Sequence, residues 1–170
     1  MDKFKEFIVK KELTSNEKVS RVFITLCAVS LASLAVLFTM GTVLNMIGLF
    51  AACLSLYGGW RLICSFFVEY EYTITNFDLD IDKIINQSKR KRLCTIDLHT
   101  VTEYGRLTDD FKLEDGETFV KASSCNPELS DYYLRFEHKS LGKAVLLYTP
   151  STEILELVTS SCPRRAKNNL

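Results

Sequence analysis

The residues best suited to binding a charged partner form a run of four consecutive cations in the middle of the chain. Such a run can contact anionic lipid headgroups, since each cation near a charged membrane surface contributes about 1 kcal/mol. It can also pair with carboxylates on a neighbouring β-strand. The sequence leaves both interpretations open, and they concern Lys89, Arg90, Lys91 and Arg92.

Acidic residues alternate with apolar ones just before this run, in the pattern D-x-D-x-D from Asp78 to Asp82. A calcium loop that begins in this way has glycine at its sixth position and glutamate at its twelfth. Lys83 and Lys89 hold those two positions here. The pattern therefore favours the outward positions of a strand over a metal site.

The alternation also suggests what the cations could neutralise. If residues 76–77 form a two-residue turn, Glu71 lies opposite Asp82, and like charges directly opposite each other destabilise a sheet. We expect Lys89 and Lys91, on the adjoining strand, to neutralise this acidic pair.

The chain shows no recognisable catalytic set. His99 and His138 are the only histidines, and the motifs G-x-S-x-G, Walker A and G-x-G-x-x-G do not occur. The six cysteines lack the spacing of a zinc site. We therefore expect no enzyme activity, no metal and no cofactor. Tyrosines at strand spacing indicate sheet packing, with a tyrosine-lined ligand groove as the alternative: Tyr70, Tyr72, Tyr132, Tyr133 and Tyr148.

The overall charge is balanced, with 21 Lys and Arg against 21 Asp and Glu. A nucleic-acid-binding domain would show a basic domain or stripe, so we expect no nucleic-acid partner.

A long apolar block precedes these residues. Residues 22–40 carry no charge and would span about 28 Å as a helix, close to the thickness of a bilayer core. A turn at Gly41-Thr42 and a second apolar run ending at Trp60-Arg61 follow. We predict a transmembrane hairpin within residues 22–67, with helices at about 22–40 and 43–61. A cleaved signal peptide is the alternative, but its charged start would be shorter and a second apolar run would not follow.

Basic residues lie before the first helix and at the end of the second, and the turn between them has none. This pattern predicts a cell-membrane protein with both termini in the cytoplasm. Phe4, Phe7, Ile8 and Lys11 recur at helical spacing, so we expect residues 1–21 to form an amphipathic segment, on the membrane surface or in solvent.

Small residues recur every four positions in both helices and would let their backbones approach closely. They are Ala28 and Ala32 in the first, and Ala51, Ser55 and Gly59 in the second. We expect them to pack the hairpin, with a dimer face as the alternative.

Period-two alternation predicts a mainly β domain over residues 68–162. The predicted orientation of the hairpin makes this domain cytosolic. Ser151 is placed to cap a C-terminal helix that ends at Cys162-Pro163, and residues 163–170 form a polar tail. We predict an α+β fold with a partly open antiparallel barrel of about seven strands, capped by this helix. The expected strands are residues 68–75, 78–85, 91–98, 101–107, 118–122, 132–138 and 144–148.

The order of elements and the segment VEYEYTITNFDLDID resemble bacterial pleckstrin-homology-like (PH-like) two-pass membrane proteins, an uncharacterised subgroup. The resemblance covers most of the chain and implies a seven-stranded barrel with a C-terminal helix. In PH domains that bind inositides the first two strands are basic, whereas here they are acidic.

These features predict a membrane-tethered, non-enzymatic interaction module at the cytoplasmic face, with a protein or lipid headgroups as its partner. The alternatives are an accessory subunit that joins a larger membrane complex through its helices, and an enzyme with an unfamiliar site.

Overall fold

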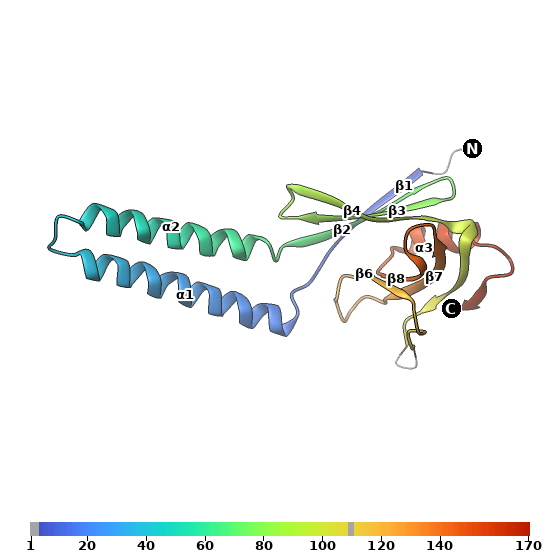
Figure 1. The fold of residues 1–170 in the computed structure, drawn as a ribbon. Helices are drawn as coiled ribbons and strands as arrows, with labels where there is room; N and C mark the ends of the chain where they lie inside the picture. The colour runs from blue at the N-terminus through green and yellow to red at the C-terminus, as the bar shows by residue number, and fades with distance from the viewer. Residues whose placement is uncertain (1–3, 109–110) are drawn as a thin grey trace. The chain divides into compact units, whose positions relative to one another are not determined.

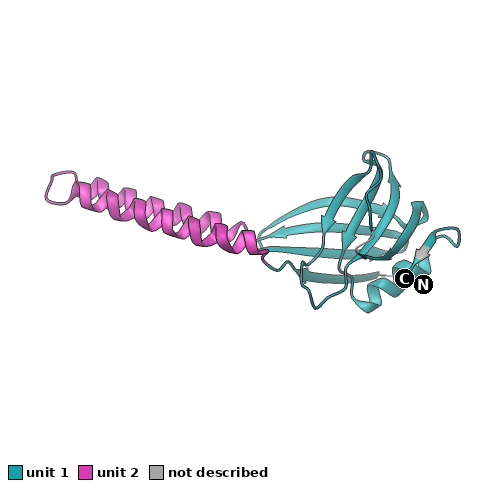
Figure 2. Cartoon of the chain, turned by 90° about the horizontal axis from the view of Figure 1, so that it is seen from below, with its two compact units in different colours: residues 1–12, 68–170 teal, residues 13–67 magenta. Residues whose placement is uncertain are grey.

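The computed structural model describes residues 4–108 and 111–170. Residues 1–3, the start of the predicted amphipathic segment, lie outside the described residues. The chain divides into two compact units (Figure 2): a helical unit of residues 13–67, and a β unit that combines residues 1–12 with 68–170.

The helical unit is a hairpin of α1 (Ser15–Thr39) and α2 (Asn45–Cys64), which lie side by side (Figure 1). α1 begins before the predicted span because Thr14 and Glu17 form a capping box, in which Glu17 accepts a hydrogen bond from the Thr14 N–H at 2.9 Å. Both helices are long and apolar enough to cross a membrane, judged by length and composition.

Small residues bring the two helices together. Ser55 Oγ donates to the carbonyl oxygen of Ala28 at 3.1 Å, and a Cβ atom at Gly59 would lie 2.6 Å from the Ala28 Cβ. Ala32 is buried, as expected, but Ala51 is exposed and Ala52 is buried in its place.

The expectation for Ala51 was wrong because a strict four-residue repeat drifts around a helix. Each residue turns the helix by about 100°, so eight residues separate Ala51 from Gly59 by about 80° around the axis. The seven residues between Ala52 and Gly59 leave an offset of only about 20°.

The first sheet of the β unit, sheet A, is antiparallel with the order β1-β2-β3-β4. Its strands are β1 (Phe4–Lys10), β2 (Val68–Thr75), β3 (Asp78–Ile85) and β4 (Lys89–Asp97). The amphipathic helix predicted for the N-terminal segment was wrong for Phe4–Lys10. These residues alternate as in a strand, with Phe7 opposite Tyr72 and Val9 opposite Tyr70, and they cover the edge of β2.

β1 and β2 are neighbours although the whole helical unit separates them in the sequence. The pairing continues past the strands, since the Lys11 N–H donates to the Val68 carbonyl oxygen at 2.9 Å. The next N–H, of Glu12, donates to Ser124 O at 2.7 Å. The helical hairpin is therefore an insertion between two adjacent strands of one sheet.

The second sheet, sheet B, has the order β6-β8-β7-β5-β9, with β6/β8 and β5/β9 parallel and the other pairs antiparallel. Its strands are β5 (Val101–Arg106), β6 (Thr118–Ala122), β7 (Tyr132–His138), β8 (Gly142–Tyr148) and β9 (Lys167–Asn169). A short 3₁₀ helix, η1 (Leu98–Thr100), connects β4 to β5.

All seven predicted strands are present, but they belong to two sheets rather than to one barrel. The described part of the chain contains two further strands: β1, and β9 within the predicted polar tail. α3 (Thr152–Ser161) begins as expected, with the Ser151 side chain accepting a hydrogen bond from the Ile154 N–H.

Both sheets and α3 share one core. Tyr72 of sheet A donates its hydroxyl to Ala122 O and accepts from the Thr149 N–H at 3.2 Å, both at the ends of sheet B strands. Its ring meets that of Tyr148 edge to face, with centroids 5.8 Å apart. Ile154 and Val158 of α3 are also fully buried in this cluster. Sheet A is thus joined to sheet B by both apolar packing and a buried hydroxyl.

The close approach at Gly59 makes a direct prediction. Gly59→Leu should destabilise the hairpin by about 1–3 kcal/mol, because the side chain would overlap α1. Gly58→Leu is the matched control, since no atom lies within 4 Å of a Cβ at Gly58. The thermal midpoint of the purified chain in detergent, followed by far-UV circular dichroism, should fall for the first variant only; equal midpoints would contradict the packing.

Candidate functional site

The predicted basic run lies on β4, and its two arginines are engaged on the outer face of sheet A, away from the core. Arg90 pairs with Glu71. Arg92 Nε lies 2.9 Å from Asp82 Oδ1, and its Nη1 lies 3.0 Å from Asp80 Oδ2. Charge pairing therefore accounts for the two arginines of the run, Arg90 and Arg92.

The expectation that lysines neutralise the acidic pair was wrong. Glu71 does lie opposite Asp82, but the β3–β4 register shifts between Ile81 and Asp82, so that Ile81 faces Cys94 and Asp82 faces Arg92. The extra residue, Leu93, is a β-bulge that reverses which side chains of the preceding residues point outward.

Lys89 and Lys91 consequently point to the other face of sheet A and are exposed. Lys91 lies opposite Lys83, and Lys89 lies opposite Ile85. Within residues 4–108 and 111–170, none of these three lysines is within ion-pair distance of a carboxylate. They form a lysine row at the end of sheet A where β1 ends and β2 begins.

Glu71 is nearly fully buried, with 4% of its side chain exposed. Burial raises the pKa of Glu71 above its usual value, Arg90 opposes this shift, and Glu6 and Asp82 add to it. The aspartates of the D-x-D-x-D pattern take part in this charge network, and no group of three potential metal ligands is found among the described residues.

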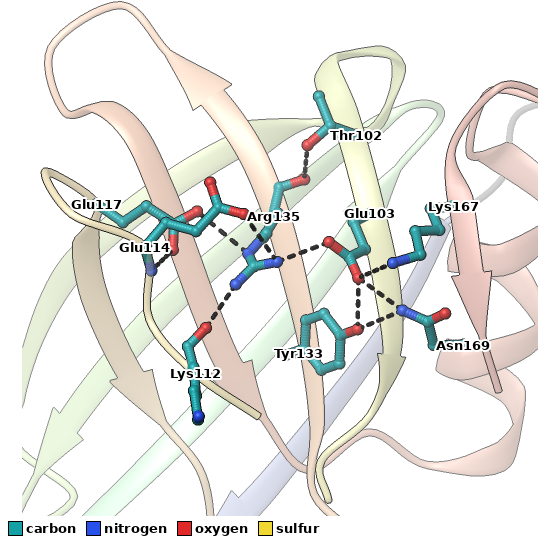
Figure 3. A network of polar contacts seen from close by, with 9 residues as sticks. All are labelled: Thr102, Glu103, Lys112, Glu114, Glu117, Tyr133, Arg135, Lys167 and Asn169. Atoms are coloured by element: carbon teal, nitrogen blue, oxygen red, sulfur yellow. Dashed lines mark hydrogen bonds and ion pairs between the residues drawn. The ribbon is translucent and has the colours of Figure 1, made fainter. Parts of the chain in front are cut away.

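A second cluster, which the sequence did not indicate, surrounds Arg135 on the outer face of sheet B (Figure 3). Arg135 Nη1 donates to Glu103 Oε2 on β5 at 2.7 Å, and Arg135 Nη2 donates to Lys112 O at 2.7 Å. Its Nε lies 3.1 Å from Glu117 Oε1, and its Nη1 lies 3.4 Å from Glu114 Oε1. One guanidinium thus joins β5, β7 and the connection before β6.

The cluster extends to β9. Asn169 Nδ2 donates to Glu103 Oε1 at 2.6 Å and to the Tyr133 hydroxyl at 2.7 Å, and Tyr133 donates in turn to Glu103 at 3.0 Å. Burial tends to raise the pKa of Glu103, but the hydrogen bonds from Arg135 and Tyr133 outweigh it and lower the pKa. Glu103 is therefore held as a carboxylate.

Two cavities flank the cluster, and both are lined by Glu103 and Arg135. The first, called the acidic cavity, measures about 300 Å³ and also has Glu114, Glu117, Glu137, Lys143 and Lys167 in its lining. The second, called the basic cavity, measures about 290 Å³ and also has Arg106, Phe111, Lys112, Tyr133 and Asn169 in its lining. These surfaces can hold charged groups; neither histidine lines them.

The Arg135 cluster was missed because its members are spread from residue 102 to residue 169 and form no motif. Only the alternation on β7, which places Tyr133, Arg135 and Glu137 on one face, was available. That alternation is equally typical of a solvated sheet surface.

A comparison with known protein families gives a match over almost the whole chain. A family model described as "Bacterial PH-like domain (DUF6106)" matches residues 1–168. No curated protein and no solved structure matches the chain.

The pKa shifts of buried Glu71 and half-buried Glu103 are opposite, and they predict opposite effects of neutralisation. Ionised Glu103 stabilises the fold above its usual pKa, and this stabilisation is lost as the pH falls through the lowered pKa. Glu103→Gln should therefore lower the free energy of unfolding by about 1.5–3 kcal/mol at pH 7. The free energy of unfolding of this variant should also depend less on pH below about pH 5.

Glu71→Gln is the matched comparison. Because its pKa is raised, ionised Glu71 is less favourable in the folded chain, and stability is gained as the pH falls through that raised value. The variant should be at least as stable as the unaltered chain at pH 7. Urea unfolding followed by near-UV circular dichroism measures the free energy of unfolding of both variants. An equal decrease for Glu103→Gln and Glu71→Gln would contradict the opposite pKa shifts.

Proposed function

The chain belongs to the bacterial PH-like family, and we propose that it is a membrane-tethered, non-enzymatic interaction module at the cytoplasmic face, which binds a protein or lipid headgroups. PH-like domains are in general protein or lipid interaction modules, and they are typically non-catalytic. Beyond this general role, we propose that the helical hairpin is a membrane anchor, that the β unit lies on the cytoplasmic side and that the lysine row is a contact surface.

The observation that carries the proposal is the exposure of two apolar helices. Only 6% of the most apolar window of α1, and 22% of that of α2, is buried. A core helix of a soluble protein would be mostly buried, whereas a membrane helix presents its apolar surface to lipid. Lipid is the solvent that suits these two surfaces.

The residues at one end of the hairpin suit a membrane boundary. Tyr57 and Trp60 are exposed with ring centroids 5.9 Å apart, and the side chain of Arg61 follows. Arg21 lies over the ring of Phe67, 4.9 Å from its centroid. Aromatic and cationic side chains gather at membrane–water interfaces, and cations favour the cytoplasmic side. This rule supports a cytoplasmic location of both termini.

The lysine row supports a contact with anionic headgroups. It lies at the end of sheet A to which both connections from the hairpin lead. Residues 65–67 between α2 and β2 span at most about 14 Å when extended, so the row is tethered within reach of the bilayer surface. Lys89 and Lys91 are the residues of the predicted run that suit this role, since Arg90 and Arg92 are already paired.

An accessory subunit remains the second candidate. Ser55 and Gly59 pack the hairpin itself, so assembly with a larger complex would use the outer helix faces. Co-purification that is lost on substitution at the exposed Leu54, with Gly59 intact, would favour this candidate.

Membrane anchoring predicts that the native chain stays in the membrane pellet after alkaline carbonate extraction, because two helices of lipid-exposed apolar surface do not partition into water. A peripheral protein with the same β unit would be released, as would a version with residues 13–67 replaced by a short Gly/Ser linker. Recovery of the native chain in the supernatant would refute the anchor.

If the lysine row contacts headgroups, amide exchange near it should depend on the charge of the lipid. In the full chain in nanodiscs, amide exchange at residues 85–91 should be slower with anionic lipid than with zwitterionic lipid. Lys89→Gln with Lys91→Gln should weaken this docking about 30-fold, at about 1 kcal/mol per lysine.

Lys121→Gln with Lys139→Gln is the matched control, since both lysines are exposed on sheet B or its turns. Hydrogen exchange measured by mass spectrometry distinguishes the two pairs. Equal amide exchange at residues 85–91 in anionic and zwitterionic lipid would refute headgroup contact and would favour a protein as the partner.

A further inference from the structure

The last strand of sheet B is a three-residue segment that pairs with the edge of β5. β9 runs parallel to β5, with Glu103 opposite Lys167 and Gly105 opposite Asn169. β5 extends beyond this pairing in both directions, so β9 covers only part of its edge. The N–H and C=O groups along a strand edge are a template for pairing with another strand.

Gly105 makes this edge accessible to a second backbone. A Cβ atom at position 105 would lie 2.7 Å from the Asn169 Cβ and 2.8 Å from the Asn169 carbonyl oxygen. Glycine inside a strand often marks a place where another backbone approaches closely. The edge is therefore shaped to accept an added strand, and any larger residue would obstruct it.

Lys167 and Asn169, which alternate along β9, both contact Glu103 but line different cavities. Lys167 lines the acidic cavity, with its Nζ 3.6 Å from Glu103 Oε1. Asn169 lines the basic cavity and binds Glu103 and Tyr133 (Figure 3). Since residues two apart in a strand face the same side, the next side chain in this series would approach the cations Arg106 and Lys112 of the basic cavity.

We propose that the edge of β5 is a docking site for an extended peptide segment of a partner protein, which adds parallel to β5 and displaces β9. The segment carries a basic residue, an amide two positions later and an acidic residue two positions after that. Main-chain hydrogen bonds supply affinity in such strand addition, and pockets for alternate side chains supply specificity. The inference rests on the proposed function as an interaction module and names the class of its partner.

β9 is suited to be displaced. It is three residues long, its pairing is parallel, which is the less stable arrangement per residue, and the Lys167 side chain is 71% exposed. A longer segment would pair with more of β5 and would also place an acidic side chain at the basic cavity. β9 is thus an internal occupant that a better-matched strand replaces.

The test uses the full chain in detergent micelles and a fluorescent peptide with the sequence of residues 163–170 followed by one aspartate. Lys167→Ala with Asn169→Ala removes the side-chain contacts of β9 and should raise the affinity for the peptide about tenfold, because an internal competitor lowers apparent affinity. A peptide with lysine in place of the added aspartate should bind more weakly, since it brings a cation to the basic cavity.

Gly105→Val in the same double variant should abolish peptide binding. Lys121→Val, on β6 at the opposite edge of sheet B, is the matched control and should leave binding unchanged. If near-UV circular dichroism shows that Gly105→Val does not fold, Tyr133→Phe provides the second variant. It removes one acceptor for the amide and should weaken binding severalfold.

Peptide binding that is absent from every variant, or that survives Gly105→Val in a folded chain, would overturn the inference. Membrane extraction and lipid-dependent exchange are measured separately. Their success alongside failed peptide binding would refute strand docking alone, whereas loss of both would refute the proposed function.

Discussion

The pairing of β1 with β2 is the constraint on which the rest of the structure depends. It runs from Phe4 opposite Thr75 to Lys10 opposite Glu69, and it continues through the bond between Lys11 N–H and Val68 O. This pairing covers one edge of β2 and brings both connections of the helical hairpin to one end of sheet A. The β unit is therefore connected to the helical hairpin through two adjacent strands rather than through a single linker.

The two charge networks of the β unit have different consequences. On sheet A, Arg90 and Arg92 neutralise buried carboxylates, and the bulge at Leu93 leaves the lysines on the opposite face without such partners among the described residues. On sheet B, Arg135 gathers carboxylates from distant segments around one guanidinium. The half-buried Arg135 and Glu103 are joined by an ion pair and by hydrogen bonds to neighbouring segments, so the second network fixes the outer surface of the sheet beside β5.

Much of the fold could be predicted because its strands alternate strictly. The bounds of β2, β3, β6 and β7 agree with the expected ranges. β1 was missed since Phe4, Phe7 and Ile8 also fit a helical period, and only its partner decides between the two. The orientation of the basic run was missed because a bulge leaves no mark in an alternating pattern, and the Arg135 cluster because its contacts join residues far apart in the sequence.

The insertion of the hairpin between β1 and β2 has a consequence for biosynthesis. β1 is translated before its partner, and it cannot pair until both helices and β2 have been translated. In the proposed arrangement, a nascent chain with only one helix across the bilayer would leave β1 and β2 on opposite sides. Sheet A would then lack its first strand, with the apolar side chains of Phe7 and Val9 separated from their partners. In that arrangement, sheet A can be completed only after both helices have crossed the bilayer.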